Sequence, residues 1–195
     1  MSVDQLANAV SDTSVDECAL VGRVAAGDRA ALESLYRSYY PRLASFLWRS
    51  IGRREGVEAI INDTFIEVWK GAHNHRGASP VISTWIFGIA YRKALEYLCQ
   101  QRSPAAWSNA PRSPGQLIDA VNDAESSGRL HQGLGTLAFE QRSTLILAYQ
   151  IGCALEEIAA ITSTPVGTVK ARMLRAREKL RAFLQPCRFE AEDNL

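Results

Sequence analysis

The chain has 195 residues, of which 47% are hydrophobic, and its formal net charge at pH 7 is +1. This length allows one domain or two small ones, the apolar content suffices for packed cores, and the near-neutral balance does not by itself indicate a nucleic-acid partner. No apolar run approaches the length of a membrane span, and residues 1–16 are too polar for a signal peptide, so we expect a cytoplasmic protein without direct membrane insertion.

The first half of the chain is predicted to be helical. Residues 28–50 have the pattern of an amphipathic helix, because apolar side chains recur at spacings of three and four. These are Leu32, Leu35, Tyr36, Tyr39, Leu43, Phe46 and Leu47. A second helix is predicted over residues 56–72 and a third over about residues 83–101, with a glycine- and proline-containing stretch between them. Together these helices predict a first helical domain over residues 16–102.

A change of composition then predicts a flexible linker over residues 103–125, where Pro104, Pro111 and Pro114 occur among serines. Helical patterning resumes after it and predicts a second helical domain over residues 126–186 with a core of its own. The apolar residues expected in that core are Leu134, Leu137, Phe139, Leu145, Leu147 and Tyr149. We expect the ends of the chain, residues 1–15 and the acidic residues 187–195, to be flexible tails.

Within the second domain lies a helix-turn-helix pattern. A short helix is predicted over residues 156–161, a tight turn over residues 162–165 and a long helix over residues 166–184. The long helix has a local net charge of +5, because it contains six basic residues and the single acid Glu178. The basic residues are Lys170, Arg172, Arg175, Arg177, Lys179 and Arg181.

The two faces of this long helix predict different roles. At about 100° per residue, one apolar stripe forms on its surface. The stripe consists of Val169, Met173, Ala176, Leu180, Phe183 and Leu184. We expect it to pack on the preceding helices and the opposite face to enter a DNA major groove. A basic face alone fits a solvated surface equally well, but the short preceding helix and the tight turn favour DNA.

Three stretches, in this order, make the chain similar to the bacterial extracytoplasmic function (ECF) sigma factors. The first is residues 62–70, NDTFIEVWK, and the second is residues 83–90, STWIFGIA, close to the family pattern TWLYRIA. The third is the helix-turn-helix between residues 156 and 177. The resemblance covers roughly residues 20–184 and implies an all-α fold of two small helical domains joined by a linker.

The resemblance also implies a function. ECF sigma factors are transcription initiation factors that bind core RNA polymerase, direct it to promoters through the −35 and −10 elements, and assist promoter melting. The implied partners are promoter DNA and the clamp helices and flap region of the polymerase. Many relatives are also held silent by an anti-sigma factor. No cofactor and no bond chemistry of its own are implied, so we do not expect an enzyme.

Candidate contact residues follow from matching the family motifs to this chain. The resemblance assigns polymerase binding to Glu58, Asp63, Phe65, Glu67 and Trp69. A melted −10 element needs stacking surfaces for bases and cations for the backbone. The candidates for it are Asn74, Arg76, Trp85, Arg92 and Lys93, although Trp85 would serve equally well as a core residue. The candidates for the −35 element are Thr168, Lys170, Arg172, Leu174, Arg175 and Arg177.

The chain departs from the family in the acidic patch that usually precedes the clamp-binding helix. The aligned stretch, residues 56–59, keeps only Glu58, with Asp63 further along. One hypothesis is that a Ser/Thr kinase restores the charge at Thr64, since a phosphate adds about −1.5 to −2. The alternative is an ordinary threonine, with compensating contacts elsewhere.

Two other classes of protein remain open. The chain could be a helix-turn-helix regulator that binds duplex DNA without supporting initiation, or a decoy that binds an anti-sigma factor or polymerase. An enzyme is disfavoured because the three histidines, His73, His75 and His131, have no catalytic partners at motif spacing. The four cysteines of the chain form no CxxC pair, so we expect no metal site.

Overall fold

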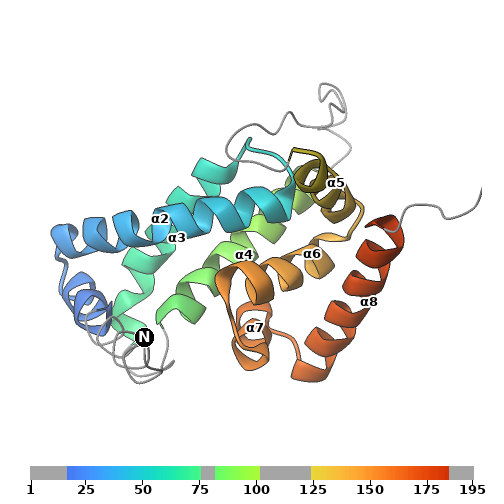
Figure 1. Cartoon of the computed structure of the whole chain (residues 1–195). Coiled ribbons are helices and arrows are strands. Elements are labelled where there is room, and N and C mark those ends of the chain that lie inside the picture. The colour runs from blue at the N-terminus through green and yellow to red at the C-terminus, as the bar shows by residue number, and fades with distance from the viewer. Residues whose placement is uncertain (1–16, 76–81, 102–123, 185–195) are drawn as a thin grey trace, which may run out of the picture.

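The computed structural model describes residues 17–75, 82–101 and 124–184, and these residues form helices and short connections without a strand (Figure 1). The all-α class predicted from the sequence is therefore confirmed. Both predicted tails, most of the predicted linker and Arg76 lie outside the described residues. None of the described helices combines the length and apolar character that a membrane span requires.

The first module, residues 17–101, contains a helix over residues 17–25 and three longer helices. These are α2 (Arg29–Ile51), α3 (Val57–Gly71) and α4 (Ile82–Gln101), with the short 3₁₀ helix η1 (Ala72–Asn74) after α3. Each long helix begins and ends within one residue of its prediction.

Local chemistry explains where two of these helices begin. The carboxylate of Asp28 accepts hydrogen bonds from the backbone N–H groups of Ala30 at 2.9 Å and Ala31 at 3.2 Å, which caps α2. Before α3, Gly56 adopts φ +84, and a Cβ there would lie 2.4 Å from the ring of Tyr97. Only glycine fits this position, because both the backbone conformation and the neighbouring ring exclude a side chain.

The second module, residues 124–184, consists of short helices that lead into one long helix. They are α5 (Ala124–Gly135), α6 (Phe139–Ile146), the π-helical turn η3 (Leu147–Ile151), α7 (Leu155–Thr162) and α8 (Val166–Leu184). Because α5 begins at Ala124, its first two residues lie inside the predicted linker. The helix-turn-helix is formed by α7 and α8, and the turn between them holds Ser163 in the left-handed region with φ 51.

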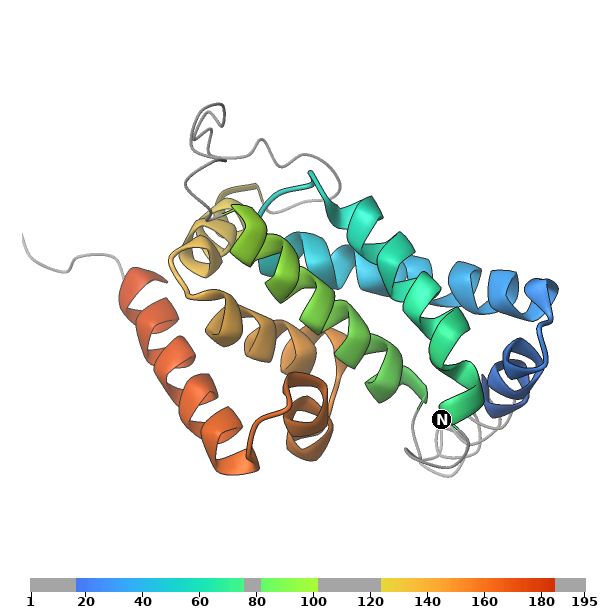
Figure 2. The same cartoon turned by 180° about the vertical axis from the view of Figure 1, so that it is seen from behind.

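The two modules pack directly against each other. Helix α7 contacts α4, while α6 and η3 contact α2, and Figure 2 shows α4 between α3 on one side and α6 and α7 on the other. Phe139 and Leu147 were expected in a separate second core, but they belong to the same buried cluster as Leu43 and Ile86 of the first module. That expectation was wrong because these side chains face α2 and α4.

A smaller cluster remains within the second module. Leu137, Leu145 and Ala176 are buried there, with Leu134, Met173 and Leu180 packed against them. Tyr149, also expected in a core, is 67% exposed. The π-helical turn thus presents its tyrosine to solvent, while Leu147 beside it is fully buried.

Candidate nucleic-acid and polymerase interfaces

Helix α8 exposes one basic face, and the opposite apolar stripe is buried at two residues and partly covered at three others. Val169 and Ala176 are fully buried, and Met173 and Leu180 are partly buried, as the helical periodicity predicts. Phe183, at the end of the stripe, is 39% exposed. The opposite face leaves five predicted contact residues exposed to solvent: Thr168, Lys170, Leu174, Arg175 and Arg177.

Arg172 differs from the other predicted −35 residues because it is only half-exposed. Its guanidinium donates a hydrogen bond of 3.5 Å to the hydroxyl of Thr164, in the turn before α8. Among the described residues, none of the basic side chains of α8 forms an ion pair. This face can therefore offer its cations to phosphates and base edges without first breaking an ion pair.

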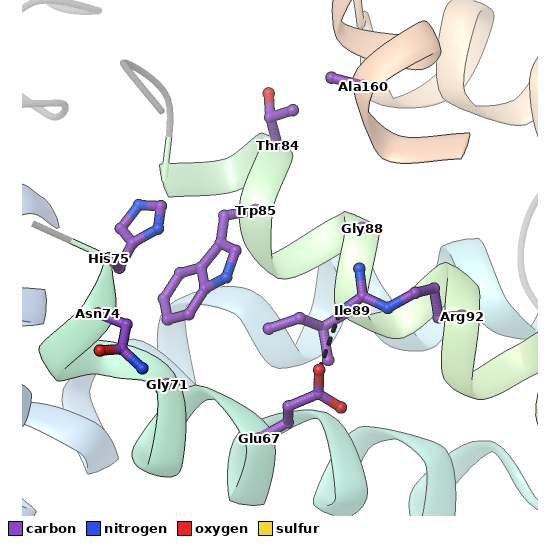
Figure 3. Close-up of a pocket in the computed structure, with 10 residues that line it drawn as sticks. All are labelled: Glu67, Gly71, Asn74, His75, Thr84, Trp85, Gly88, Ile89, Arg92 and Ala160. Atoms are coloured by element: carbon purple, nitrogen blue, oxygen red, sulfur yellow. Dashed lines mark hydrogen bonds and ion pairs between the residues drawn. The ribbon is translucent and has the colours of Figure 1, made fainter. Parts of the chain in front are cut away.

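A cavity of about 480 Å³ lies between α3, α4 and α7 (Figure 3). It is lined by Glu67, Gly71, Asn74, His75, Thr84, Trp85, Gly88, Ile89, Arg92 and Ala160. Three of the predicted −10 residues, Asn74, Trp85 and Arg92, are thus brought together on its walls. Of these side chains, Asn74 and Arg92 are exposed and Trp85 is half-buried.

His75 and Trp85 form a stacked pair in this cavity. Their rings are 4.0 Å apart between centroids and 13° from parallel. His75 is 8% exposed, its Nε2 atom has no hydrogen-bond partner in the described structure, and burial lowers the pKa of its imidazole. The sequence did not identify His75 as a site residue, although its position beside Asn74 in the same loop was a usable signal.

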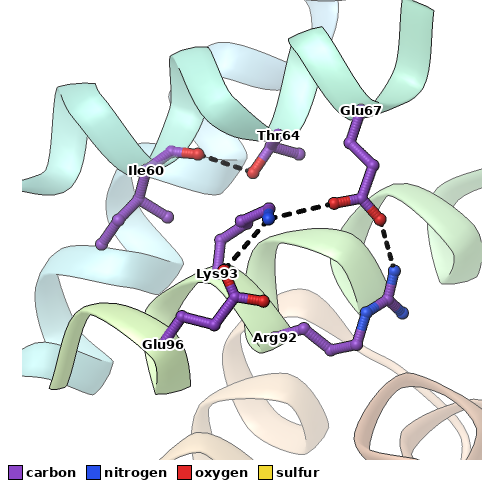
Figure 4. Close-up of polar contacts among 6 residues, drawn as sticks. All are labelled: Ile60, Thr64, Glu67, Arg92, Lys93 and Glu96. Atoms are coloured by element: carbon purple, nitrogen blue, oxygen red, sulfur yellow. Dashed lines mark hydrogen bonds and ion pairs between the residues drawn. The ribbon is translucent and has the colours of Figure 1, made fainter. Parts of the chain in front are cut away.

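The cations of α4 are paired with an acid of α3 (Figure 4). Glu67 accepts from Arg92 at 2.8 Å and from Lys93 at 3.3 Å, and Lys93 also lies 3.0 Å from Glu96. Burial alone would raise the pKa of Glu67, but the hydrogen bonds from Arg92 and Lys93 outweigh it and lower this pKa. Part-exposed pairs of this kind are weak, about 0.2–1 kcal/mol, so a phosphate can displace Glu67.

The outer surface of α3 carries only part of the predicted polymerase set. Glu58 and Asp63 are exposed, and Glu67 and Trp69 are half-exposed. Phe65 is 4% exposed and its ring lies 4.9 Å from that of Tyr36, so it is a core residue and its predicted contact with polymerase is wrong for this arrangement. Ile66 is 51% exposed, and sequence reasoning missed it.

Thr64 is fully buried, and its hydroxyl donates a 2.7 Å hydrogen bond to the carbonyl oxygen of Ile60 (Figure 4). A kinase cannot reach a buried hydroxyl, and a phosphate would not fit there without opening the packing around α3. The hypothesis of a phosphorylation switch at this residue therefore has no support.

Comparison with known proteins identifies two family regions in the chain. Residues 35–103 match Sigma-70 region 2, and residues 127–180 match Sigma-70 region 4. The RNA polymerase sigma-H factor of Pseudomonas aeruginosa is 29% identical over 185 residues, covering 88% of this chain and 95% of that protein. The ECF RNA polymerase sigma-E factor of Escherichia coli K12 is 30% identical over 188 residues, covering 86% of this chain and 93% of that protein.

Solved structures share the fold. CnrH in complex with the cytosolic domain of CnrY matches with a TM-score of 0.63 and 25% identity, over 86% of this chain and 96% of that chain. The sigma factor RpoE of Bartonella quintana, in complex with the anti-sigma factor NepR, matches with a TM-score of 0.68 and 22% identity, over 80% and 98% of the two chains. Since both sigma regions match in order and relatives align over almost their whole length, the chain belongs to the ECF RNA polymerase sigma factors, the transcription initiation factors that direct RNA polymerase to promoters.

Proposed function

We propose that this sigma factor reads the −35 element with the exposed face of α8. The observation that carries the proposal is the exposure of Lys170, Leu174 and Arg175 on this face. Val169 and Ala176 on the opposite face are fully buried and anchor α8 to the rest of the module. Arginine and lysine can bond guanine in the major groove, and Leu174 can contact a thymine methyl. Thr168, Arg172 and Arg177 are assigned to phosphates.

We further propose that the cavity beside α4 receives an unstacked base of the −10 element. The stacked pair of His75 and Trp85 offers an aromatic wall, and Asn74 offers hydrogen-bonding groups at its rim. Arg92 and Lys93 would bind phosphates of the DNA backbone, which would replace the carboxylate of Glu67 as their partner. Stacking on aromatic side chains contributes about 1–3 kcal/mol per base, enough to favour a melted strand locally.

The exposed surface of α3 is the proposed contact with the polymerase clamp, through Glu58, Asp63 and Ile66. Because RNA polymerase acts in the cytoplasm, we propose that this chain acts there as well. CnrH and RpoE were solved with CnrY and NepR bound, and we propose that an anti-sigma factor likewise controls this chain.

The test is transcription with purified components. The protein is mixed with core RNA polymerase and a library of genomic fragments, and transcript starts are mapped to find shared upstream elements. Specific starts with common −35 and −10 sequences support the proposal. Tight duplex binding without a polymerase complex would instead identify a stand-alone regulator, and a polymerase complex that never initiates would identify a decoy.

Replacing Arg175 tests the −35 assignment. We expect Arg175→Ala to weaken promoter binding by about 1–3 kcal/mol and to relax the preference at one −35 base pair, as loss of a base contact does. Promoter affinity and the mapped −35 sequence provide the measurement. Arg181→Ala removes the same charge from an exposed position later in α8 and should change the affinity little. Equal losses for both variants would contradict a base contact by Arg175.

A further inference from the structure

The end of α2 and the turn that follows it carry a concentration of positive charge. Arg49, Arg53 and Arg54 lie within residues 49–54, with Glu55 as the acid beside them, whereas the whole chain has a net charge of only +1. Arg49 and Arg54 are exposed and Arg53 is half-exposed. Among the described residues, neither Arg49 nor Arg53 forms an ion pair. These three arginines are called the basic turn.

Arg53 is the member of the basic turn that packs against α4. Its guanidinium carbon lies 5.7 Å from the centroid of the Tyr97 ring. Arg54, by contrast, lies over the ring of Trp48 in α2, 5.2 Å from its centroid. A guanidinium stacked on an aromatic ring has its plane held, while its N–H edges can still donate to a planar or tetrahedral anion.

Tyr97 fixes this turn to the C-terminal end of α4. Its hydroxyl donates a 3.2 Å hydrogen bond to the carbonyl oxygen of Glu55. Its ring fills the space beside Gly56, since a Cβ there would lie 2.4 Å from it. Figure 2 shows the turn beside this end of α4. Arg53 therefore has a defined position relative to α4, although it belongs to a turn.

The position of Arg53 extends a row of cations along α4. Lys93 lies one helical turn before Tyr97 on the same face, because residues four apart follow each other on a helix. Arg92 is next to Lys93, and Glu96 in the same stretch is already paired with Lys93 (Figure 4). The row therefore runs from Arg92 and Lys93 across the Tyr97 ring to Arg53.

We propose that Arg53 binds the sugar–phosphate backbone of double-stranded DNA next to the −10 element. The proposal rests on the proposed role of the cavity beside α4, where Trp85 faces an unstacked base. Trp85 and Tyr97 are 12 positions apart, which is about 18 Å along α4 at 1.5 Å per residue. This length corresponds to about five base pairs at 3.4 Å per step.

The order of the modules gives the direction of the contact. From Gln101, at the end of α4, the chain continues into the second module, which is proposed to read the −35 element. Because the −35 element lies upstream of the −10 element, the C-terminal end of α4 faces upstream and Trp85, near its start, faces the melted bases. The phosphate that Arg53 binds therefore belongs to the duplex about five base pairs upstream of the unstacked base.

Duplex DNA fits this position better than an acidic protein surface does. The planar fork of an arginine matches the oxygens of a phosphate. Arg92 and Lys93 are already proposed to bind the DNA backbone, and a backbone that passes them continues toward Arg53. An acidic protein surface would have to begin where that strand ends.

A structural role for Arg53 makes a different prediction. Arg53 follows Gly52, which ends α2 with φ 81, and a cation there also complements the negative end of the helix dipole. That role would change the stability of the free chain and leave promoter binding unaffected. Thermal stability and promoter affinity therefore separate the two roles.

The salt dependence of promoter binding tests the contact in the polymerase holoenzyme. Arg53→Gln is compared with Arg37→Gln, which removes the same charge from an exposed position in the first half of α2. Arg53→Gln should make the slope of log K against log salt concentration shallower by about 0.9, as loss of one phosphate contact does. It should also weaken binding severalfold on every −10 sequence, and Arg37→Gln should do neither. Equal slopes for the two variants would overturn the proposal.

Arg53→Lys separates a phosphate contact from disturbed packing. It keeps the charge, so its salt slope should match that of the unmodified chain. If Arg53→Lys loses as much slope as Arg53→Gln, the effect comes from the altered turn and not from a lost contact. If Arg53→Gln lowers only the melting temperature of the free chain and leaves promoter affinity unchanged, Arg53 has the structural role alone.

Neutralised phosphates locate the contact on the promoter. Duplexes with one methylphosphonate at successive positions upstream of the −10 element are bound by the unmodified holoenzyme and by the Arg53→Gln holoenzyme. A methylphosphonate about five base pairs upstream of the unstacked base should weaken the unmodified complex severalfold. It should have little further effect on the variant, because the partner of that phosphate is already missing. Equal losses for both holoenzymes at every position would exclude the contact.

Binding of core polymerase separates DNA from a protein partner. Arg53→Gln should bind core polymerase as tightly as the unmodified chain does. A weakened polymerase complex would place Arg53 against an acidic protein surface and would contradict the DNA contact. If the unmodified chain itself forms no polymerase–promoter complex, the proposed function is rejected, whatever Arg53 does.

Discussion

His131 is a single residue that connects the two modules. It belongs to α5, and its ring stacks on Trp48 of α2 with 6.4 Å between centroids. Burial chiefly, and then the charges of Arg142 and Arg49, lower the pKa of this histidine below its ordinary 6.5. The folded chain therefore favours the neutral imidazole, while the unfolded chain takes up a proton as the pH falls through 6.5.

Because the unfolded chain binds a proton at His131 more readily than the folded chain does, the free energy of unfolding should decrease when the pH is lowered. His75 contributes in the same direction, since burial lowers its pKa as well. Replacing His131 by Gln should make the loss of stability between about pH 7.5 and pH 5.5 shallower, because one proton-uptake step of the unfolded chain disappears. Urea unfolding at a series of pH values measures the slope. His73→Gln, at an exposed position, is the control, and a His131→Gln slope equal to that of the unmodified chain would contradict the prediction.

At the scale of the element, α7 begins with an incomplete cap. Ala154 has the extended conformation of an N-cap residue, and its backbone N–H donates a 2.7 Å hydrogen bond to the carboxylate of Glu157. An alanine side chain has no acceptor to return a bond to the first turn of the helix. Only half of a capping box is therefore present.

Completing that cap should stabilise the protein. Ala154→Ser adds a hydroxyl that can accept from the N–H of Glu157, and replacements of this kind are worth about 0.5–2 kcal/mol. Thermal or urea unfolding measures the gain. Ala182→Ser, at an exposed position inside α8, should instead be neutral or slightly destabilising, because serine is a poorer helix former than alanine. If Ala154→Ser stabilises the protein no more than Ala182→Ser does, the added hydroxyl does not cap α7.

At the scale of the whole molecule, the shared core makes the two modules depend on each other. Leu147 of η3 is fully buried in the cluster that includes α2, α3 and α4. A packing defect at this residue therefore affects both modules. The free protein should behave as one cooperative unit.

Leu147→Ala tests this cooperativity. The truncation should cost about 2–5 kcal/mol, as for other fully buried leucines. Hydrogen exchange of the amides of α3 and α8, followed in denaturant, should show the same shift of the unfolding midpoint in both helices. Leu174→Ala, at a leucine that is 59% exposed, should change stability by less than about 0.5 kcal/mol. A shift confined to α8 would mean that the modules unfold independently.

The sequence by itself determined the helices of this protein. The spacing of apolar residues placed α2, α3, α4, α7 and α8 to within one residue, and α2 runs without a break through Pro41. The same periodicity separated the buried stripe of α8 from its basic face. These features are local, since three or four consecutive turns of a helix contain all the information that they need.

The partner of each buried face was decided only by the tertiary structure. A helical stripe shows that a face is covered but not what covers it, so Phe65 could be assigned to polymerase although it packs on Tyr36. His75 is buried against Trp85 of the next helix, and Phe139 and Leu147 complete a core that also contains Leu43 of α2. The contact between α7 and α4 depends on which surfaces are complementary after each module has folded, and no pattern within a single helix encodes that choice.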